Sequence, residues 1–330
     1  MINGIQGLAK LGIDATLPSL PKFVVVGDQS HGKSSLVEAL CKISLPRNEG
    51  TCTRCPFQIT TTESRTWSCT VSLVVRWEYD ATSKLKPFPR WKDTGEEQTL
   101  EFAIVEDRDE LEETLRRAQF CILNPSMNPL DILRADEIDM RASQSHFSPN
   151  VVSVHIRGTD LPELSVYDLP GAINMAPSES EKDLVSLVEN MLMRYLRDDK
   201  ALVLLAASLS SDIDTSTAFK FVTQAKAIKR CMGVLTKPDL FVTQNPQKIK
   251  NILSNKEFKV GNGWYVTMQL SQQDLDQGTA SYAEARTREE TFFASQHPWK
   301  SHLQSFQDRF TIRNLQDALS HKLYEHIVDE

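Results

Sequence analysis

One short stretch near the N-terminus restricts what this chain can fold into more than any other. The apolar run Phe23–Val26 is followed by Gly-Asp-Gln-Ser-His-Gly-Lys-Ser at residues 27–34 and then by the helical-looking segment Leu36–Cys41. This order is typical of a phosphate-binding loop, in which backbone N–H groups and a helix N-terminus surround an anion. The alternative, an accidental glycine turn, is disfavoured by the flanking strand and helix. In such a loop Lys33 contacts the β- and γ-phosphates and the Ser34 hydroxyl ligates Mg²⁺.

The loop indicates a nucleoside triphosphate, and the composition limits what else the chain can be. Its 330 residues are 40% hydrophobic and 25% charged, enough for the core of one large domain or two smaller ones. The net charge of −7 and the dispersed basic residues argue against a nucleic-acid or anionic-membrane surface. The longest apolar run, Ala201–Ala207, has the length of a strand, not of a membrane span. Six scattered cysteines and the lack of a signal pattern favour a reducing, cytoplasmic setting.

The hydrophobic pattern predicts an α/β fold. Trp67–Trp77 alternates between apolar and polar residues, which predicts an antiparallel strand with one wet face. Val151–Ile156 and Leu164–Tyr167 are expected to be paired strands. Strands and helices then alternate, which predicts a mostly parallel sheet with helices on both faces. The expected elements are a helix at Glu179–Leu196 with Ser178 and Glu181 as a capping box, strands at Ala201–Ala207, Met232–Leu235 and Trp264–Met268, and helices at about Thr215–Ile228 and Pro246–Leu253.

The middle and the two ends of the chain carry weaker signals. Lys84–Thr94 is rich in proline and charge, which predicts an exposed loop, and Glu106–Cys121 has a helical pattern. We find no chemistry between residues 78 and 150. Ile2–Leu11 and Ile312–Ile327 carry apolar residues at helical spacing. We expect these two stripes to be exposed on helices that flank the nucleotide module.

Two further motifs each follow a predicted strand. Asp-Leu-Pro-Gly at residues 168–171 fits the second magnesium-side motif, in which the aspartate holds the metal through water and the Gly171 N–H bonds the γ-phosphate. Thr-Lys-Pro-Asp at residues 236–239 fits a guanine motif. A carboxylate at Asp239 accepts from both N1–H and the 2-amino group of guanine, a donor pair that adenine lacks. Each tetrapeptide alone could be a strand-ending turn, but together with the loop they indicate a guanine nucleotide.

With these motifs the chain resembles the dynamin superfamily of large GTPases. The matching segments follow the family order over nearly the whole chain, at residues 27–35, 45–47, 53–56, 168–171, 191–193, 211–212, 236–239, 292–293 and 297–298. The resemblance implies an extended Ras-like P-loop GTPase domain at residues 21–305, an N-terminal bundle-helix segment at 1–20 and a C-terminal junction helix at 306–330. It also implies Mg²⁺ as cofactor, GTP and GDP as ligands, and membrane contact only through segments absent from this chain.

The resemblance also bears on catalysis. Ras-like enzymes orient the attacking water with a glutamine just after Asp-x-x-Gly, but Ala172 and Ile173 stand there in this chain. The resemblance gives that role to Gln29 within the phosphate loop, with Thr53 on the Mg²⁺ and water side, although Gln29 alone could be an ordinary loop amide. No arginine finger is evident. In the family a monovalent cation, K⁺ or Na⁺, can replace it, and Ser30 corresponds to one of its ligands.

Further site residues are expected from the same resemblance. Asp212 matches an aspartate that reaches across a head-to-head homodimer, and an N-cap for the following helix is an equally good interpretation. Gln269 stands at the asparagine position of the last base-contacting segment. His31, where alanine or serine is usual, is expected to point to solvent. The expected nucleotide-binding residues are Asp28, Gln29, Ser30, His31, Gly32, Lys33, Ser34, Ser35, Thr236, Lys237, Asp239, Gln269, Ser271 and Gln272; the metal residues are Ser34, Thr53 and Asp168; the catalytic residues are Gln29, Ser30, Thr53 and Gly171.

We therefore expect a GTP-hydrolysing mechanochemical domain, activated by head-to-head dimerisation and coupled to movement of the flanking helices, with membrane remodelling as the role of the longer protein. A GTP-binding scaffold with little hydrolysis is the alternative, motivated by the missing glutamine. An ATP-dependent phosphotransferase fits the loop but not Asp239. Cys52 and Cys55 form a Cys-x-x-Cys pair, but no second pair or histidine cluster completes a zinc site, so two incidental thiols are favoured.

Overall fold

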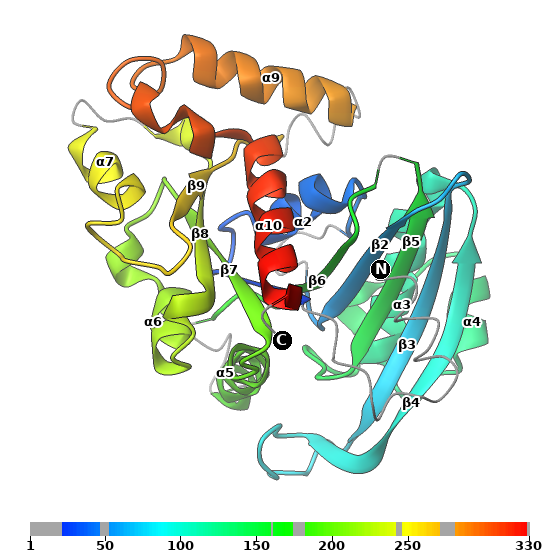
Figure 1. Ribbon diagram of the computed structural model, residues 1–330. Coiled ribbons are helices and arrows are strands. Elements are labelled where there is room, and N and C mark those ends of the chain that lie inside the picture. The colour runs from blue at the N-terminus through cyan, green and yellow to red at the C-terminus, as the bar shows by residue number, and fades with distance from the viewer. Residues whose placement is uncertain are drawn as a thin grey trace.

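The computed structural model describes residues 22–46, 53–159, 161–173, 182–241, 246–270 and 281–328. They fold around a nine-stranded sheet with the strand order β4-β3-β5-β2-β6-β1-β7-β8-β9 (Figure 1). The strands are β1 (Lys22–Val26), β2 (Phe57–Glu63), β3 (Ser68–Tyr79), β4 (Trp91–Val105), β5 (Val151–Gly158), β6 (Leu164–Asp168), β7 (Ala201–Ser208), β8 (Cys231–Thr236) and β9 (Trp264–Val266). Five of the eight described neighbouring pairs are parallel, which confirms the predicted mostly parallel sheet.

Helices cover both faces of this sheet, so the structure has two apolar cores. The helices α2 (Lys33–Cys41), α3 (Leu111–Leu123), α4 (Pro129–Arg134) and α10 (Thr311–Val328) contribute to the first core, whereas α5 (Lys182–Leu196), α6 (Thr217–Gln224), α7 (Gln247–Leu253) and α9 (Tyr282–Ser295) contribute to the second. In β1, Phe23 and Val25 face the first core while Val24 and Val26 face the second, and each is at most 1% exposed. A strand buried on both faces must be apolar at every position.

Two predictions about the strands are wrong. The strands β5 and β6 are not paired with each other, because β2 lies between them, parallel to β5 and antiparallel to β6. The strand β2 could not be recognised from its sequence, because the residues that it buries include the polar Thr60–Thr62 and form no apolar pattern. The loop predicted at Lys84–Thr94 ends earlier than expected, because β4 begins at Trp91 and pairs with β3. Residues 92–101 of β4 are all exposed, so the strand has almost no apolar signal.

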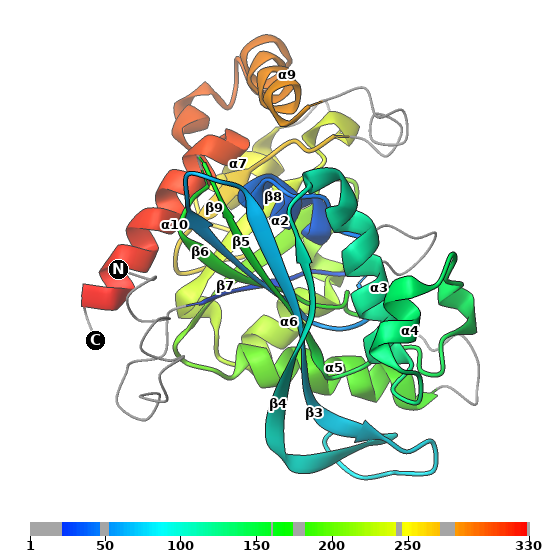
Figure 2. The ribbon, with the colours of Figure 1, turned by 90° about the vertical axis from the view of Figure 1, so that its right-hand side faces the viewer.

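The antiparallel strand predicted at Trp67–Trp77 is present as β3, but its apolar side chains divide between the two cores. Leu73 belongs to the first core and Trp77 to the second. The Asn150 side-chain oxygen accepts hydrogen bonds from the consecutive N–H groups of Arg76 and Trp77, at 3.0 and 2.8 Å. Consecutive N–H groups on one side of a strand are the geometry of a β-bulge, which turns the following side chains to the opposite face. Figure 2 shows β3 and β4 extending beyond the other strands.

The apolar stripe near the C-terminus is buried, not exposed as expected. It lies on α10, which runs over the first core next to α2 (Figure 1). Its residues Ile312, Leu315, Leu319 and Leu323 are at most 7% exposed. The other stripe, Ile2–Leu11, and the capping box at Ser178 and Glu181 lie outside the described residues. Within the part of the chain described here, no helix combines the length and the apolar composition needed to cross a membrane.

Candidate functional site

The three predicted nucleotide motifs meet at one edge of the sheet. The phosphate loop follows β1, residues 168–171 begin at the end of the neighbouring strand β6, and residues 236–239 lie at the end of β8. The strands β6, β1, β7 and β8 are mutually parallel, so their carboxyl ends share an edge, the usual ligand site of such sheets. Two hydrogen bonds connect the motifs directly: Thr236 Oγ1 donates to His31 O at 2.8 Å, and Ala172 N donates to Gly27 O at 3.2 Å.

The phosphate loop has the conformation that its glycines allow. Ser30 and Gly32 have φ angles of 63° and 77°, in the left-handed region. A Cβ atom at Gly27 would lie 2.6 Å from Ala206 O, so no side chain fits there. The Asp28 side chain accepts a hydrogen bond from Ala218 N at 3.0 Å and joins the loop to α6. The loop is therefore packed against β7 at Gly27 and hydrogen-bonded to α6 at Asp28.

The residues predicted to hold metal form a compact oxygen cluster at the base of this loop. Asp168 Oδ2 accepts hydrogen bonds from Thr53 Oγ1 at 2.9 Å and from Ser34 Oγ at 3.0 Å, and the two hydroxyl oxygens are 3.0 Å apart. Asp168 is fully buried, and its second oxygen, Oδ1, has no hydrogen-bond partner among the described residues. Burial raises the pKa of Asp168, while the charge of Lys33 and the two hydroxyl groups act in the opposite direction.

This cluster fits a small, hard divalent cation. Two hydroxyls and one carboxylate with an unsatisfied oxygen are ligands of the kind that Mg²⁺ accepts, because Mg²⁺ takes few protein ligands and completes its shell with water and phosphate. Over the described ranges, no group of three or more histidine, cysteine, aspartate or glutamate side chains is placed to hold a metal.

Cys55 is fully buried and burial raises the pKa of its thiol, whereas Cys52 lies outside the described residues. This is consistent with the interpretation of Cys55 as an incidental thiol.

Gln29 and Gly171 lie beside each other above the cluster. A Cβ atom at Gly171 would lie 2.9 Å from Lys33 Nζ and 3.0 Å from Gln29 Cα. Lys33 is 6% exposed, and its Nζ donates to Asp28 O at 3.0 Å. Gln29 and Ser30 are both exposed at the rim of the loop. Ala172 is 3% exposed, so the position that carries the catalytic glutamine in Ras-like enzymes is occupied by a buried methyl group.

His31 does not point to solvent, which corrects the sequence-based prediction. Its side chain is 15% exposed and its Nε2 lies 3.2 Å from Ser211 Oγ. Burial lowers the pKa of His31, an effect that the nearby Asp28 carboxylate opposes. The left-handed residues Ser30 and Gly32 on either side turn the imidazole onto the segment after β7. No local sequence pattern could have signalled this contact, since 180 residues separate the two partners.

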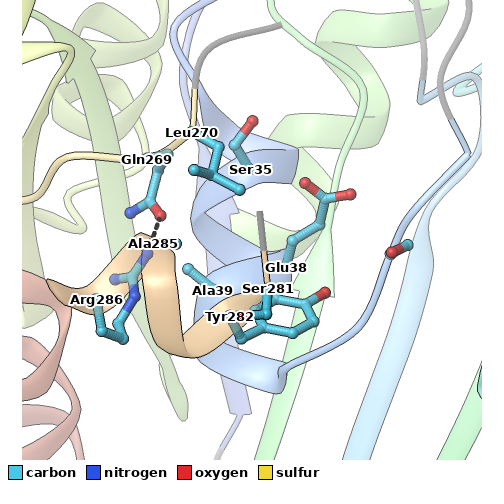
Figure 3. Close-up of a pocket in the computed structure, with 10 residues that line it drawn as sticks. Ser35, Glu38, Ala39, Gln269, Leu270, Ser281, Tyr282, Ala285 and Arg286 are labelled. Atoms are coloured by element: carbon cyan, nitrogen blue, oxygen red, sulfur yellow. Dashed lines mark hydrogen bonds between the residues drawn. The ribbon is translucent and has the colours of Figure 1, made fainter. Parts of the chain in front are cut away.

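At the predicted guanine end, the motif residues have different surroundings. Thr236 is 1% exposed and supports the phosphate loop, whereas Asp239 is exposed in the short turn that follows β8. Gln269 Oε1 accepts a hydrogen bond from Arg286 Nη2 at 3.1 Å. Both residues border a cavity of about 170 Å³ between α2, the segment after β9 and the start of α9 (Figure 3). Ser271 and Gln272 lie outside the described residues.

Asp212 lies on the segment after β7, and its side chain makes no N-cap hydrogen bond. Its carboxylate is instead 2.5 Å from Lys248 Nζ, and the side chain is 68% exposed. Asp212 therefore occupies the N-cap position of the short 3-10 helix Ile213–Thr215 without capping it through its side chain. It is an accessible charge at the same edge of the sheet as the phosphate loop.

Sequence reasoning missed the role of Arg54, which follows Thr53. Its guanidinium donates to three backbone carbonyls, Met140 O at 2.8 Å, Ser145 O at 3.2 Å and His146 O at 2.7 Å. Arg54 thus attaches the segment that carries Thr53 to residues 140–146. The motif contained the arginine, but nothing in its spacing indicated which distant carbonyls it would bind.

Comparisons with known proteins point to one family. The family model described as "Dynamin family" matches residues 23–238, and the one described as "Dynamin central region" matches residues 248–330. Over 99% of its length the chain is 28% identical to the interferon-induced GTP-binding protein Mx2 of Ictalurus punctatus and 27% identical to Mx1 of Ovis aries. It covers 45% and 43% of those two proteins, so the chain spans less than half the length of the curated relatives it matches.

Proposed function

Because this chain belongs to the dynamin family and is a GTPase domain of that family, we propose how its own residues bind GTP and hydrolyse it to GDP and phosphate. The observation that carries the proposal is the convergence of Ser34, Thr53 and Asp168 beside the Lys33 ammonium. Lys33 and the Gly171 N–H contact the γ-phosphate from adjacent positions. Asp239 accepts from the N1–H and the 2-amino group of guanine, so the site should prefer GTP to ATP.

The metal and the nucleophile are served by different residues. Ser34, Thr53 and Asp168 would hold Mg²⁺, which when bound neutralises charge on the β- and γ-phosphates. Gln29 orients a water molecule for in-line attack on the γ-phosphorus. The new bond joins the water oxygen to phosphorus while the bond to the β,γ-bridging oxygen breaks. The electron pair of that bond stays on GDP, and both protons of the water leave with the inorganic phosphate. Ser30, exposed beside Gln29, would help to hold a K⁺ or Na⁺ ion, which when bound would supply the positive charge that an arginine finger supplies in other GTPases.

Activation by a second copy of the chain is part of the proposal. The exposed Asp212 carboxylate would leave Lys248 and reach across to the second copy when two nucleotide faces dock. For the longer protein, we propose movement of the flanking helices, membrane remodelling and a cytoplasmic location. A scaffold that binds GTP with little hydrolysis is the second candidate, favoured by the buried Ala172 at the usual glutamine position.

Hydrolysis measured against protein concentration separates the two candidates. We expect the specific GTPase activity to rise with protein concentration in potassium buffer, and to rise much less in choline buffer, because the dimer and the monovalent cation complete the site. GTP binding without turnover at any concentration would favour the scaffold. Activity independent of concentration would contradict activation by dimerisation.

Replacing Gln29 with alanine tests the catalytic assignment. We expect the single-turnover rate of GTP hydrolysis to fall about 100-fold, the usual loss for one group that acts on the transition state, with GTP affinity changed only a few-fold. The matched control is Gln98→Ala, since Gln98 is exposed on β4, away from the site. A Gln29→Ala protein with the wild-type rate would remove Gln29 from catalysis.

A further inference from the structure

A buried carboxylate on α9 joins two stretches of backbone that are far apart in the sequence. Glu289 is 1% exposed. Its Oε1 accepts a hydrogen bond from Met268 N at 2.7 Å, and its Oε2 accepts one from Ile312 N at 3.1 Å. Arg286, one turn earlier on α9, also donates to Oε2, at 2.9 Å. Both oxygens are therefore satisfied, and each of the three donors comes from a different part of the structure.

The two backbone donors lie where regular hydrogen bonding ends. Met268 is two residues past the end of β9, and Ile312 is in the first turn of α10. The first N–H groups of a helix have no partner within that helix, and a negative charge near them is favourable to the helix dipole. Glu289 thus supplies, from a different helix, the acceptor that the start of α10 needs. Removing the carboxylate would leave buried donors unpaired, so this contact is more specific than apolar packing.

Arg286 extends the same unit to the predicted base-contacting side chain. While Nη1 binds Glu289, Nη2 donates to Gln269 Oε1 at 3.1 Å, the contact drawn as a dashed line in Figure 3. Gln269 Nε2 is buried and has no hydrogen-bond partner in the described part of the chain. Arg286 therefore holds the Gln269 amide with its N–H₂ group available for an acceptor, such as the O6 carbonyl of guanine.

The helix α10 has a second attachment, to the phosphate-loop helix. Gln316 Nε2 donates to Leu40 O near the end of α2, at 3.2 Å. The loop residue Lys33 is the first residue of α2. The first turn of α10 is thus bonded through Glu289 to the segment that carries Gln269, and its second turn is bonded to the helix that begins at the phosphate loop. One attachment is therefore made to the segment after β9, and the other to the helix that follows the phosphate loop.

We infer that Glu289 is a positioning residue that couples occupancy of the guanine end of the site to α10. A shift of Gln269 on contact with guanine would move the Met268 backbone and, through the shared carboxylate, the first turn of α10 at Ile312. The inference rests on the proposed function, because it takes Gln269 to be in contact with the base. Beyond the proposed function, the inference names Glu289 as the residue that transmits the effect of base contact from Gln269 to α10.

The test compares Glu289→Gln with wild type by hydrogen–deuterium exchange with and without saturating GDP. In wild type, GDP should slow exchange both in residues 264–270 and in the first turns of α10. A glutamine has the same shape but turns an N–H₂ group toward a donor, so the α10 response to GDP should be lost. The dissociation constant for GDP should rise about 5-fold, the worth of one hydrogen bond. Glu290→Gln is the matched control, since Glu290 is the next residue on α9 and is exposed.

The results of this experiment separate failure of the inference from failure of the proposed function. An α10 response to GDP that is the same in Glu289→Gln as in wild type and in Glu290→Gln would overturn the inference alone. Failure of the wild-type protein to bind GDP would overturn the proposed function and the inference with it. If Glu289→Gln does not fold, Arg286→Lys carries the test, because it keeps the positive charge but loses the fork that reaches Gln269. That variant should weaken GDP binding and reduce the α10 response, and a wild-type response in it would again overturn the inference.

Discussion

Replacing Lys33 with alanine is expected to reduce the single-turnover rate of GTP hydrolysis at least about 100-fold. The Lys33 ammonium is nearly buried beside Gly171 and is the one cation of the phosphate loop. In the proposed site, its loss would remove the positive charge that binds the β- and γ-phosphates. It also removes the charge that opposes the rise in the pKa of the buried Asp168, so that carboxylate becomes a poorer anionic metal ligand. The measurement is hydrolysis of radiolabelled GTP with enzyme in excess.

A matched control separates this effect from a general loss of charge. Lys84 is exposed in the loop before β4, so Lys84→Ala should hydrolyse GTP at the wild-type rate. The circular dichroism spectra of both variants should match wild type. A Lys33→Ala protein that keeps more than a tenth of the wild-type rate would contradict the role given to the loop.

Replacing Asp239 with asparagine is expected to change which base the site accepts. Two hydrogen bonds from guanine to a charged carboxylate are together worth about 3–6 kcal/mol, so GTP affinity should fall roughly 10²- to 10⁴-fold. Asparagine offers an N–H₂ donor where the carboxylate accepted, which suits the 2-oxo group of xanthine. Affinity for xanthosine triphosphate should therefore rise in the variant. Competition against a fluorescent guanine nucleotide, with GTP, ATP and xanthosine triphosphate as competitors, measures all three affinities.

The control for the Asp239→Asn substitution is Asp214→Asn, because Asp214 is another exposed aspartate and lies after β7. It should leave the order of nucleotide affinities unchanged. Wild-type protein that binds ATP as tightly as GTP would exclude the guanine assignment and favour the phosphotransferase interpretation. Unchanged GTP affinity in Asp239→Asn would show that the carboxylate makes no contact with the base.

The predictability of the fold followed the strength of the apolar signal in each strand. The strands β1, β7 and β8 are buried on both faces, so their continuous apolar runs were legible, as was the alternation in β3. In contrast, β2 buries threonines and β4 exposes ten consecutive residues, 92–101, and both were missed. Their positions depend on hydrogen bonds to neighbouring strands, which leave no pattern in the residues themselves.

The sequence by itself determined the residue types that carry the site and the edge of the sheet at which they meet. Glycines at positions 27, 32 and 171 act through local backbone geometry, and a motif that ends a parallel strand must lie at the carboxyl edge. Only the tertiary structure decided that His31 turns inward, that Arg54 secures the Thr53 segment and that Glu289 joins Met268 to Ile312. The physical reason is that each of these polar side chains binds a partner far away in the chain, in most cases a backbone group that every residue type possesses. The sequence shows which side chain is available for such a contact, but it does not show which distant group that side chain will bind.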